Sequence, residues 1–381
     1  MRQVYFIFFF LAILAIALGL IFGLKDGTIE PEVVRWVAGG TGDSPLLYSS
    51  DGINWKSGSG VDIDDLGQGV GYGLSSDLST GIWAANIAGE GRGIVYSLNG
   101  RNWKNSTGIS SNWNALYGGP AYGLSSDKQT GIWVSGSNFG RSLIFSLDGQ
   151  SWKPATGASF GLNSSGYPIT PYGVAYGLSA NGTSVIWVAN GNNGKILYSL
   201  DGQSWQPSRG TSFTESGYGV AYGLSSNGTS GIWVAVGSGS DSLLYSLDGQ
   251  SWQPTTGASF GRASGGYGVA YGLSAEGTSL WVATGGDAGG GGIFLYSLDG
   301  QSWRRPENNF PGANGWDVAY GFSSNGTSGI WVANTHNDGL LHSLDGQCWK
   351  QASGASFNIG FAVGSNRPNP ALVGTDANPF A

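Results

Sequence analysis

The stretch Leu243-Leu244-Tyr245-Ser246-Leu247-Asp248-Gly249-Gln250-Ser251-Trp252 recurs along the chain and decides the fold. Its core, S-x-D/N-G-x-x-W, occurs seven times, with the third residue at Asp51, Asn99, Asp148, Asp201, Asp248, Asp299 and Asp345. The copies are 46 to 53 residues apart. Self-similarity at this period is typical of supersecondary units arranged in a stack or ring. The chain is therefore a repeat protein.

Each unit carries short apolar segments of β type. Around Asp248 these are residues 222–225, 232–235 and 243–246, and a fourth segment begins at Trp252. The connections between the segments are rich in Gly, Asn, Asp and Ser, as hairpins require. No stretch after residue 33 has sustained helical periodicity. Four antiparallel strands per unit predict an all-β fold, a seven-bladed propeller.

The order of strand types predicts how the ring closes. We name the strands of a unit a to d, where strand a holds the Tyr-Gly-Leu-Ser run. The chain enters its first unit at strand b, near residues 34–38, and segment 358–365 resembles a strand a with no strand b after it. We expect this segment to complete blade one, because a closed ring buries its sheet edges. The propeller then spans residues 33–365, and a tail follows at 366–381.

Tryptophan usage follows the repeat. Of 16 tryptophans, all but two fall on two repeat positions, which predicts that they pack inside and between blades. The strand b set is Trp36, Trp83, Trp133, Trp187, Trp233, Trp281 and Trp331. The set at the start of strand d is Trp55, Trp103, Trp152, Trp205, Trp252, Trp303 and Trp349. Small residues alternate with large ones along strand a, as Gly223 does with Tyr222 and Leu224, so one blade face can interlock with the next.

The motif itself is expected to be a self-contained turn between strands c and d. Its Asp side chain can accept backbone N–H groups, and its Gly supplies a positive φ. Asn99 can accept the same bonds without a charge. This substitution indicates a structural rather than a catalytic carboxylate.

The motif resembles the Asp-box, or BNR, repeat of sialidases and related propellers, whose pattern has one more residue between Asp and Gly. The resemblance covers about residues 33 to 365. For sialidases it implies an arginine triad, a Tyr/Glu nucleophilic pair and an Asp acid/base, and none of these maps onto residues of this chain. Four glutamates in expected loops keep a paired-carboxylate glycosidase as an alternative: Glu90, Glu215, Glu276 and Glu307.

Composition excludes several classes of function. The chain has 17 basic and 24 acidic side chains, a net charge of −7, and no Lys/Arg run that would neutralise a phosphate backbone, so nucleic acid is not an expected partner. Cys348 is the one cysteine, which excludes an intrachain disulfide and a thiolate metal cluster. The two histidines do not have the spacing of metal ligands. We expect no metal and no cofactor.

The amino-terminal segment is apolar. Residues 4–24 contain no charge, and as a helix of about 1.5 Å per residue they would cross the hydrocarbon core of a bilayer. We expect a membrane anchor at 1–24 and a linker at 25–32. Arg2 precedes the helix, so the positive-inside rule keeps the amino terminus cytoplasmic and the propeller extracytoplasmic. The alternative is a signal peptide cleaved after a small-x-small pattern at residues 15–17, which would leave a secreted protein.

Departures from the repeat provide the candidate binding residues. The loops between strands d and a are long and variable, so a ligand is expected on their face, away from the membrane. Trp113 and Trp316 lie outside the two packing positions, and Asp317 replaces a repeat Gly. A tryptophan beside hydrogen-bonding groups suits a sugar ring, although Trp316 also occupies a position where other units pack a tyrosine. The full candidate set is Trp113, Trp316, Asp317, Tyr167, Arg141 and Asp64.

The expected function is recognition or adhesion through a glycan or protein partner, with a glycosidase or a purely structural surface protein as alternatives. Five N-x-S/T sequons are potential glycosylation sites if the chain is secreted in a eukaryote. Three of them, at Asn181, Asn227 and Asn325, fall in expected a–b turns on the membrane side. The other two, at Asn105 and Asn163, are expected on d–a loops. Glycans would therefore leave most of the outward face accessible.

Overall fold

The structure is a computed structural model. It describes residues 33–42, 44–60, 66–88, 93–108, 118–137, 143–161, 169–262, 264–287, 291–307, 314–336, 339–354, 356–367, 369–372 and 378. The apolar segment at 4–24 lies outside the described residues, so the anchor stays a prediction. Within the described part of the chain, no helix has the length and apolar character needed to cross a membrane.

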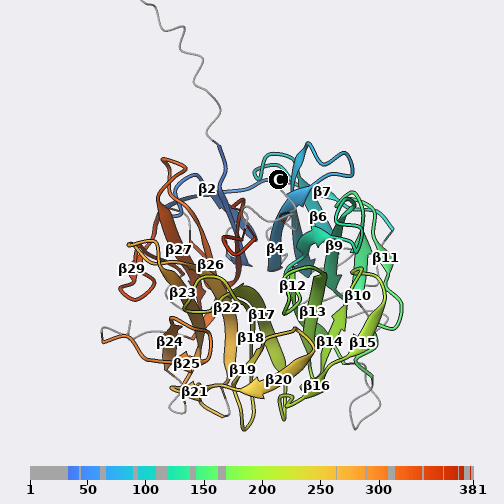
Figure 1. The fold of residues 1–381 in the computed structure, drawn as a ribbon. Coiled ribbons are helices and arrows are strands. Elements are labelled where there is room, and N and C mark those ends of the chain that lie inside the picture. Colours follow the sequence, from blue (N-terminus) through green and yellow to red (C-terminus); the bar gives the residue numbers. More distant parts are fainter. Residues whose placement is uncertain are drawn as a thin grey trace, which may run out of the picture. The chain divides into compact units, whose positions relative to one another are not determined.

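Residues 34–381 form one compact unit, an all-β propeller of seven blades around a central axis (Figure 1). The innermost strands, of type a, are β4 (Leu66–Leu74), β8 (Ala121–Leu124), β12 (Pro171–Leu178), β17 (Gly217–Leu224), β22 (Gly266–Leu273), β26 (Gly315–Phe322) and β31 (Ile359–Ser365). Strands of type b follow: β1 (Trp36–Thr41), β5 (Gly81–Ala88), β9 (Gly131–Gly136), β13 (Val185–Gly191), β18 (Gly231–Gly237), β23 (Ser279–Gly286) and β27 (Gly329–Thr335).

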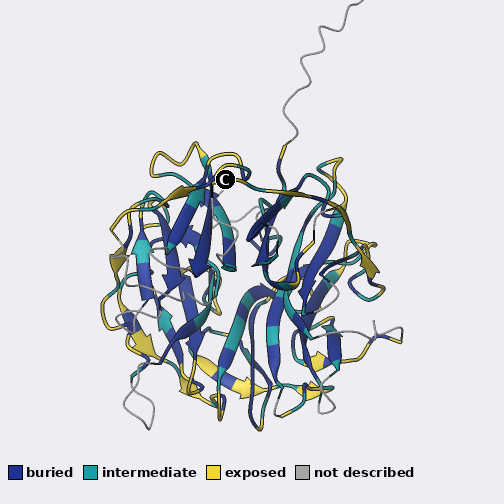
Figure 2. Cartoon of the chain, turned by 180° about the vertical axis from the view of Figure 1, so that it is seen from behind, coloured by how far each residue is buried: buried dark blue, intermediate teal, exposed yellow. Residues whose placement is uncertain are grey.

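The two outer strand types complete each antiparallel blade. Type c comprises β2 (Leu46–Ser49), β6 (Ile94–Ser97), β10 (Leu143–Ser146), β14 (Ile196–Ser199), β19 (Leu243–Ser246), β24 (Gly292–Ser297) and β28 (Leu340–Ser343). Type d comprises β3 (Asn54–Ser57), β7 (Lys104–Asn105), β11 (Lys153–Pro154), β15 (Trp205–Pro207), β20 (Ser251–Pro254), β25 (Ser302–Trp303) and β29 (Lys350–Gln351). The type b strands are the most buried, the type a strands are only partly buried along the channel, and the type d strands are mostly exposed apart from their tryptophan (Figure 2).

The ring closes as the sequence predicts. Strand β31 pairs antiparallel with β1, with Trp36 opposite Ser365 and Ala38 opposite Val363, so blade one takes its inner strand from the end of the chain. The sheet order β3-β2-β1-β31 therefore joins residues more than 300 positions apart in sequence. Closure removes the free edge that β1 would otherwise present.

The tryptophan prediction is confirmed, because all fourteen repeat tryptophans are buried. Trp233 of strand b packs on Tyr222 of its own blade, with ring centroids 5.0 Å apart. Its Nε1 donates to the Leu178 carbonyl of the preceding blade at 3.1 Å. The same position therefore joins blades through both apolar contact and a hydrogen bond.

Glycine on strand a provides the complementary surface. A Cβ atom at Gly223 would lie 2.3 Å from Cγ of Tyr271 and 2.5 Å from Cζ2 of Trp281, both in the next blade. Real Cβ atoms do not approach side chains this closely, so only glycine lets the neighbouring ring dock. The expected interlocking of blade faces is confirmed.

The repeated motif forms the expected turn. Oδ1 of Asp148 accepts the backbone N–H groups of Gln150 and Ser151 at 2.8 and 2.7 Å, and it accepts the Ser146 hydroxyl at 2.9 Å. Burial acts to raise the pKa of Asp148, but these hydrogen bonds outweigh it and hold the pKa below its ordinary value. Asn99 accepts the equivalent N–H groups of Arg101 and Asn102, both at 2.9 Å. The side chain therefore serves the turn.

A girdle of short parallel pairs links the outer edges of neighbouring blades. In several blades, the two residues that follow strand d pair in parallel with strand d of the next blade. The first of the two is Ser, Thr or Arg, and the second is Gly. Three such segments are long enough to count as strands: β16 (Arg209–Gly210), β21 (Thr256–Gly257) and β30 (Ser353–Gly354). We did not expect this girdle from the sequence. It adds inter-blade contacts at the rim to those near the axis.

The girdle requires glycine at its second position. Gly257 has φ +88°, and a Cβ there would lie 2.3 Å from the Trp303 carbonyl oxygen. Gly228, in the a–b turn between β17 and β18, is a matched control, because it also has a positive φ, +67°, but a Cβ there would meet nothing within 4 Å. We expect Gly228→Ala to destabilise the fold by about 1 kcal/mol through backbone strain alone. Gly257→Ala is expected to cost about 3 kcal/mol, because the backbone must also shift. Thermal unfolding midpoints of the two variants measure the difference, and equal losses would contradict a steric role for the girdle.

Candidate functional site

A cavity of about 520 Å³ occupies one end of the central channel. It lies where the type a strands begin, so it is on the side of the d–a loops. All seven blades contribute to its wall, through the equivalent positions Gln68, Gly118, Tyr172, Tyr218, Tyr267, Trp316 and Phe361 and the residues that follow them. Its volume is in the range of small-molecule sites.

Aromatic rings form a continuous arc over five of the seven blades. The Tyr172–Tyr218 and Tyr218–Tyr267 centroids are each 5.2 Å apart, the Tyr267–Trp316 centroids 4.6 Å and the Trp316–Phe361 centroids 5.7 Å. The tyrosine pairs are inclined by 57° and 52°. Neighbouring blades of a seven-fold ring differ by a rotation of about 51°. Each tyrosine ring therefore has the same orientation relative to its own blade, and the plane of the ring is parallel to the propeller axis.

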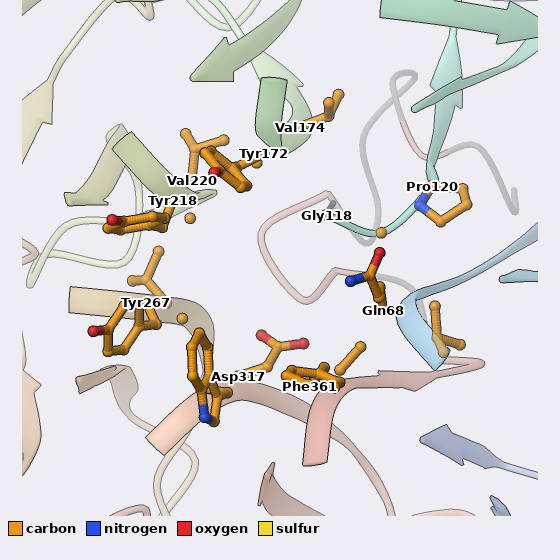
Figure 3. Close-up of a pocket in the computed structure, with 18 residues that line it drawn as sticks. Gln68, Gly118, Pro120, Tyr172, Val174, Tyr218, Val220, Tyr267, Asp317 and Phe361 are labelled. Carbon is orange, nitrogen blue, oxygen red and sulfur yellow. The ribbon is translucent and has the colours of Figure 1, made fainter. Parts of the chain in front are cut away.

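The opposite side of the cavity is not aromatic. Gln68 and Gly118 stand at the two blade positions that interrupt the arc, and Pro120 lies beside them (Figure 3). The Gln68 amide and the Asp317 carboxylate are directed into the cavity on either side of Phe361 (Figure 3). Oε1 of Gln68 is buried and has no hydrogen-bond partner among the described residues. The cavity thus combines an apolar wall with polar groups available to a ligand.

Asp317 is the one carboxylate among the described residues that line the cavity, and none of that lining is Lys, Arg or His. Its Oδ1 accepts the Val318 N–H at 2.8 Å and its Oδ2 accepts the Val363 N–H of blade one at 2.9 Å. Burial raises the pKa of this carboxyl to about 7, although the two N–H groups act to lower it. The Asp317 carboxyl is therefore protonated more readily than an exposed aspartate, and in its protonated form it can also donate a hydrogen bond.

Buried asparagines on strand b hold the cavity wall in place. Nδ2 of Asn190 donates to the Gly219 carbonyl at 2.8 Å, and its Oδ1 accepts the Gly173 N–H at 3.0 Å, which ties blade four to blade five. Asn86 donates to the Gly118 carbonyl, and Asn334 donates to the Ala362 carbonyl. All three asparagines are fully buried. The amides of Asn86 and Asn190 are hydrogen-bonded through both oxygen and nitrogen, whereas Oδ1 of Asn334 has no partner among the described residues. Hydrogen-bonded buried amides rigidify the strands that carry the lining residues.

The chain beyond β31 lies across the other end of the channel. The Arg367 guanidinium lies over the rings of Tyr320 and Phe322, 4.7 and 4.0 Å from their centroids. Nδ2 of Asn369 donates to the Tyr222 carbonyl at 2.8 Å, and the Leu372 side chain is buried. Arg367, Asn369 and Leu372 line a second cavity, of about 260 Å³, on that side. The described part of the predicted tail, up to Leu372, therefore packs against the propeller.

Two of the six candidate binding residues lie in the described part of the chain. Trp316 and Asp317 both line the cavity, and Trp316 also packs between Tyr267 and Phe361, so its packing and binding interpretations are compatible. The other four candidates, Trp113, Tyr167, Arg141 and Asp64, lie outside the described residues, as does the sequon Asn163. The expected loop position of Asn105 is wrong, because this residue ends the outer strand β7.

Sequence reasoning missed most of the cavity wall. The same repeat position holds a tyrosine in three blades, at Tyr172, Tyr218 and Tyr267. A side chain that recurs at one position of a repeat is ordinarily interpreted as a packing residue. The signal that would have found them is the break in that column, where Gln68 and Gly118 replace an aromatic residue.

The remaining described sequons serve turns. Oδ1 of Asn181, Asn227 and Asn325 accepts the N–H groups of Thr183, Thr229 and Thr327 at 3.1, 2.9 and 2.9 Å. In the a–b turn of blade two, Asp77 accepts the Ser79 N–H at 3.0 Å in the same way. The asparagines therefore have a structural role in these turns, whether or not they carry glycans.

Comparison with known proteins supports the fold. The sequence matches no protein-family model and no curated protein sequence. Its structure is similar to the BP39L lectin from Burkholderia pseudomallei, with a TM-score of 0.51, 12% identity, and coverage of 87% of this chain and 99% of the lectin. Virginiamycin B lyase from Staphylococcus aureus has a TM-score of 0.47 at 11% identity, covering 75% of this chain and 86% of the lyase. An α-L-arabinofuranosidase from Fusarium graminearum has a TM-score of 0.43 at 14% identity, covering 71% and 88%. At 12% identity, the likeness to the lectin is one of fold.

Proposed function

We propose that this chain is a membrane-anchored, extracytoplasmic recognition propeller that binds a neutral glycan in the cavity lined by Tyr172, Tyr218, Tyr267, Trp316 and Phe361. The observation that carries the proposal is the composition of that cavity, with an aromatic wall facing the Gln68 amide and the Asp317 carboxyl. Sugars present C–H faces to aromatic rings and hydroxyls to polar groups, and both kinds of surface meet here.

The charge of the lining supports a neutral ligand. The described lining contains a carboxyl group and no cationic side chain, so an acidic sugar would meet repulsion without a compensating ion pair. A sialidase-like site would instead need arginines to hold the carboxylate of its substrate. The likeness to the BP39L lectin is a likeness of fold and adds no argument about the ligand.

The finer family assignment is part of the same proposal. We infer that the repeats are short-form Asp-box repeats, because Asp148 and its equivalents accept consecutive turn N–H groups in each copy. Anchoring through residues 4–24 and an extracytoplasmic propeller are supported by the apolar length of that segment and by Arg2 before it.

A glycosidase is the second candidate, and one observation favours it. Burial raises the pKa of Asp317 to about 7, which suits a general acid. Glycoside hydrolysis usually needs a second carboxyl group about 5 to 9.5 Å away, and the described lining contains Asp317 alone. Binding without hydrolysis is therefore the better supported function.

A glycan-array screen of the full chain in nanodiscs, with product analysis of any bound sugar, tests the proposal. We expect neutral glycans to bind in preference to sialylated or sulfated ones. Gln68→Leu and Asp317→Asn should each weaken binding about tenfold, whereas Gln253→Leu, on the exposed strand β20, should leave it unchanged. Wild-type affinity should also change across pH 7 while that of Asp317→Asn does not.

The outcomes separate the candidates. Release of a cleaved sugar would replace the binding proposal with the glycosidase. Equal losses in all three variants would show that the cavity is not the site. An array without any binding would refute the glycan and redirect the search to a protein partner on the same face.

A further inference from the structure

Exposed leucines mark one position of the repeat. In six of the seven S-x-D-G turns the second residue is leucine: Leu98, Leu147, Leu200, Leu247, Leu298 and Leu344. Their side chains are 45 to 60% exposed. They make up six of the eight large apolar side chains that are exposed in the described part of the chain. Isolated exposed leucines are ordinary, but this set is fixed to one turn in successive blades.

The turns bring these leucines to a single face. Strand direction alternates within a blade, so every c–d turn lies at the same end of the propeller as every a–b turn. Leu78, another exposed apolar residue, is in the a–b turn between β4 and β5 and is therefore on this face as well. The cavity is at the opposite end, where the type a strands begin.

The chain enters the propeller on the leucine face. The Arg35 N–H donates to the Ser49 carbonyl at 3.0 Å, which fixes the start of β1 beside the first S-x-D-G turn. The charged linker at residues 25–32 joins this point to the apolar segment at 4–24. Eight residues span at most about 28 Å when fully extended. A bilayer that held the segment would thus lie within that reach of the point where the chain enters β1.

We propose that the six turn leucines form a membrane-docking ring that seats this face of the propeller on the bilayer interface. The inference rests on the membrane anchoring in the proposed function. Leucines at separate points around a ring suit a planar apolar boundary, because each inserts without needing a matching pocket. An Asp or Asn follows each leucine and no cluster of Lys or Arg occurs in these turns, so the ring suits zwitterionic lipid. Docking would hold the cavity away from the membrane.

The test uses the full chain, made without N-glycans and reconstituted in phosphatidylcholine vesicles. Cys348→Ser removes the one cysteine of the sequence, and serine is the residue at the equivalent position Ser302. An environment-sensitive fluorophore is then placed at Leu247→Cys or, as the control on the opposite face, at Ser212→Cys. We expect nitroxide-labelled lipid to quench the fluorophore at position 247 and not the one at 212. Changing Leu147, Leu200 and Leu298 to serine should abolish the quenching, while methionine at the same three positions should preserve it.

Each other result overturns the inference. A chain that resists alkaline extraction but shows no lipid quenching at position 247 is anchored without docking, which leaves the proposed anchoring intact. If alkaline extraction releases the chain from the vesicles, both the proposed membrane anchor and the docking ring that rests on it are refuted. A fluorophore protected without vesicles, more strongly at higher protein concentration, would identify a second copy of the chain as the occupant. Quenching that survives the serine changes would mean that the leucines do not make the contact.

Discussion

A chain ending after Phe357 is expected to lose cooperative folding altogether. It lacks β31, whose residues Ala362 and Val363 are buried between β1 and the neighbouring blades. Blade one would then expose the inner edge of β1, and the Val363 N–H would no longer satisfy Asp317. A native protein is stable by only about 5 to 15 kcal/mol, and removing an innermost strand forfeits more than that. Thermal unfolding followed by near-ultraviolet circular dichroism should show no transition.

A second truncation isolates the strand from the rest of the carboxy terminus. A chain ending after Leu372 retains β31, the Arg367 contacts and the buried Leu372 side chain, and should unfold at the wild-type temperature. A synthetic peptide of residues 358–372 added to the shorter chain should restore the transition, because strand addition repairs an open edge. A shorter chain that melts like wild type without the peptide would mean that ring closure does not limit stability.

Much of the fold could be predicted because each repeat unit must meet the same packing requirements, so the same residue types recur at the same positions. Gly223 between Tyr222 and Leu224 predicts close blade contact, and the missing first strand a predicts closure by residues 358–365. Both are found. The outer girdle escaped prediction because Thr256–Gly257 looks like any turn dipeptide. Its partner, Ser302, is 46 residues away in sequence, and parallel pairing between blades leaves no local pattern.

The site was predictable only where a residue breaks the repeat. Trp316 and Asp317 differ from their equivalents, so the sequence marks them as candidates, whereas Tyr218 matches the equivalent residues of other blades, which predicts packing alone. The packing assignment is incomplete rather than wrong, since the same rings contact each other and line the cavity. Whether a repeated side chain contacts a neighbouring blade or faces a cavity depends on the width of the central channel. That width is set by all seven blades together, so the sequence of one repeat does not reveal it.

Replacing Trp281 by alanine is the point substitution with the largest expected loss of stability. The indole is fully buried, lies 5.1 Å from the Tyr271 ring between centroids, and donates from Nε1 to the Leu224 carbonyl of the preceding blade at 3.0 Å. Truncation leaves a cavity between two blades, which costs about 3 to 5 kcal/mol. It also leaves the Leu224 carbonyl without its donor, at a further cost of about 1 kcal/mol. Thermal unfolding should therefore begin at a much lower temperature than in the wild type.

Two matched variants assign that loss to its causes. Trp281→Phe keeps an aromatic ring against Tyr271 but has no N–H, so it should lose about 1 to 2 kcal/mol from the hydrogen bond and the smaller volume. Leu298→Ser changes a half-exposed side chain in the same blade and should shift stability by less than about 0.5 kcal/mol. If Trp281→Ala lost no more than Leu298→Ser, the indole would not be holding the blades together. The graded order Leu298→Ser, Trp281→Phe, Trp281→Ala is expected because blade contact depends on buried aromatic volume first and on the indole hydrogen bond second.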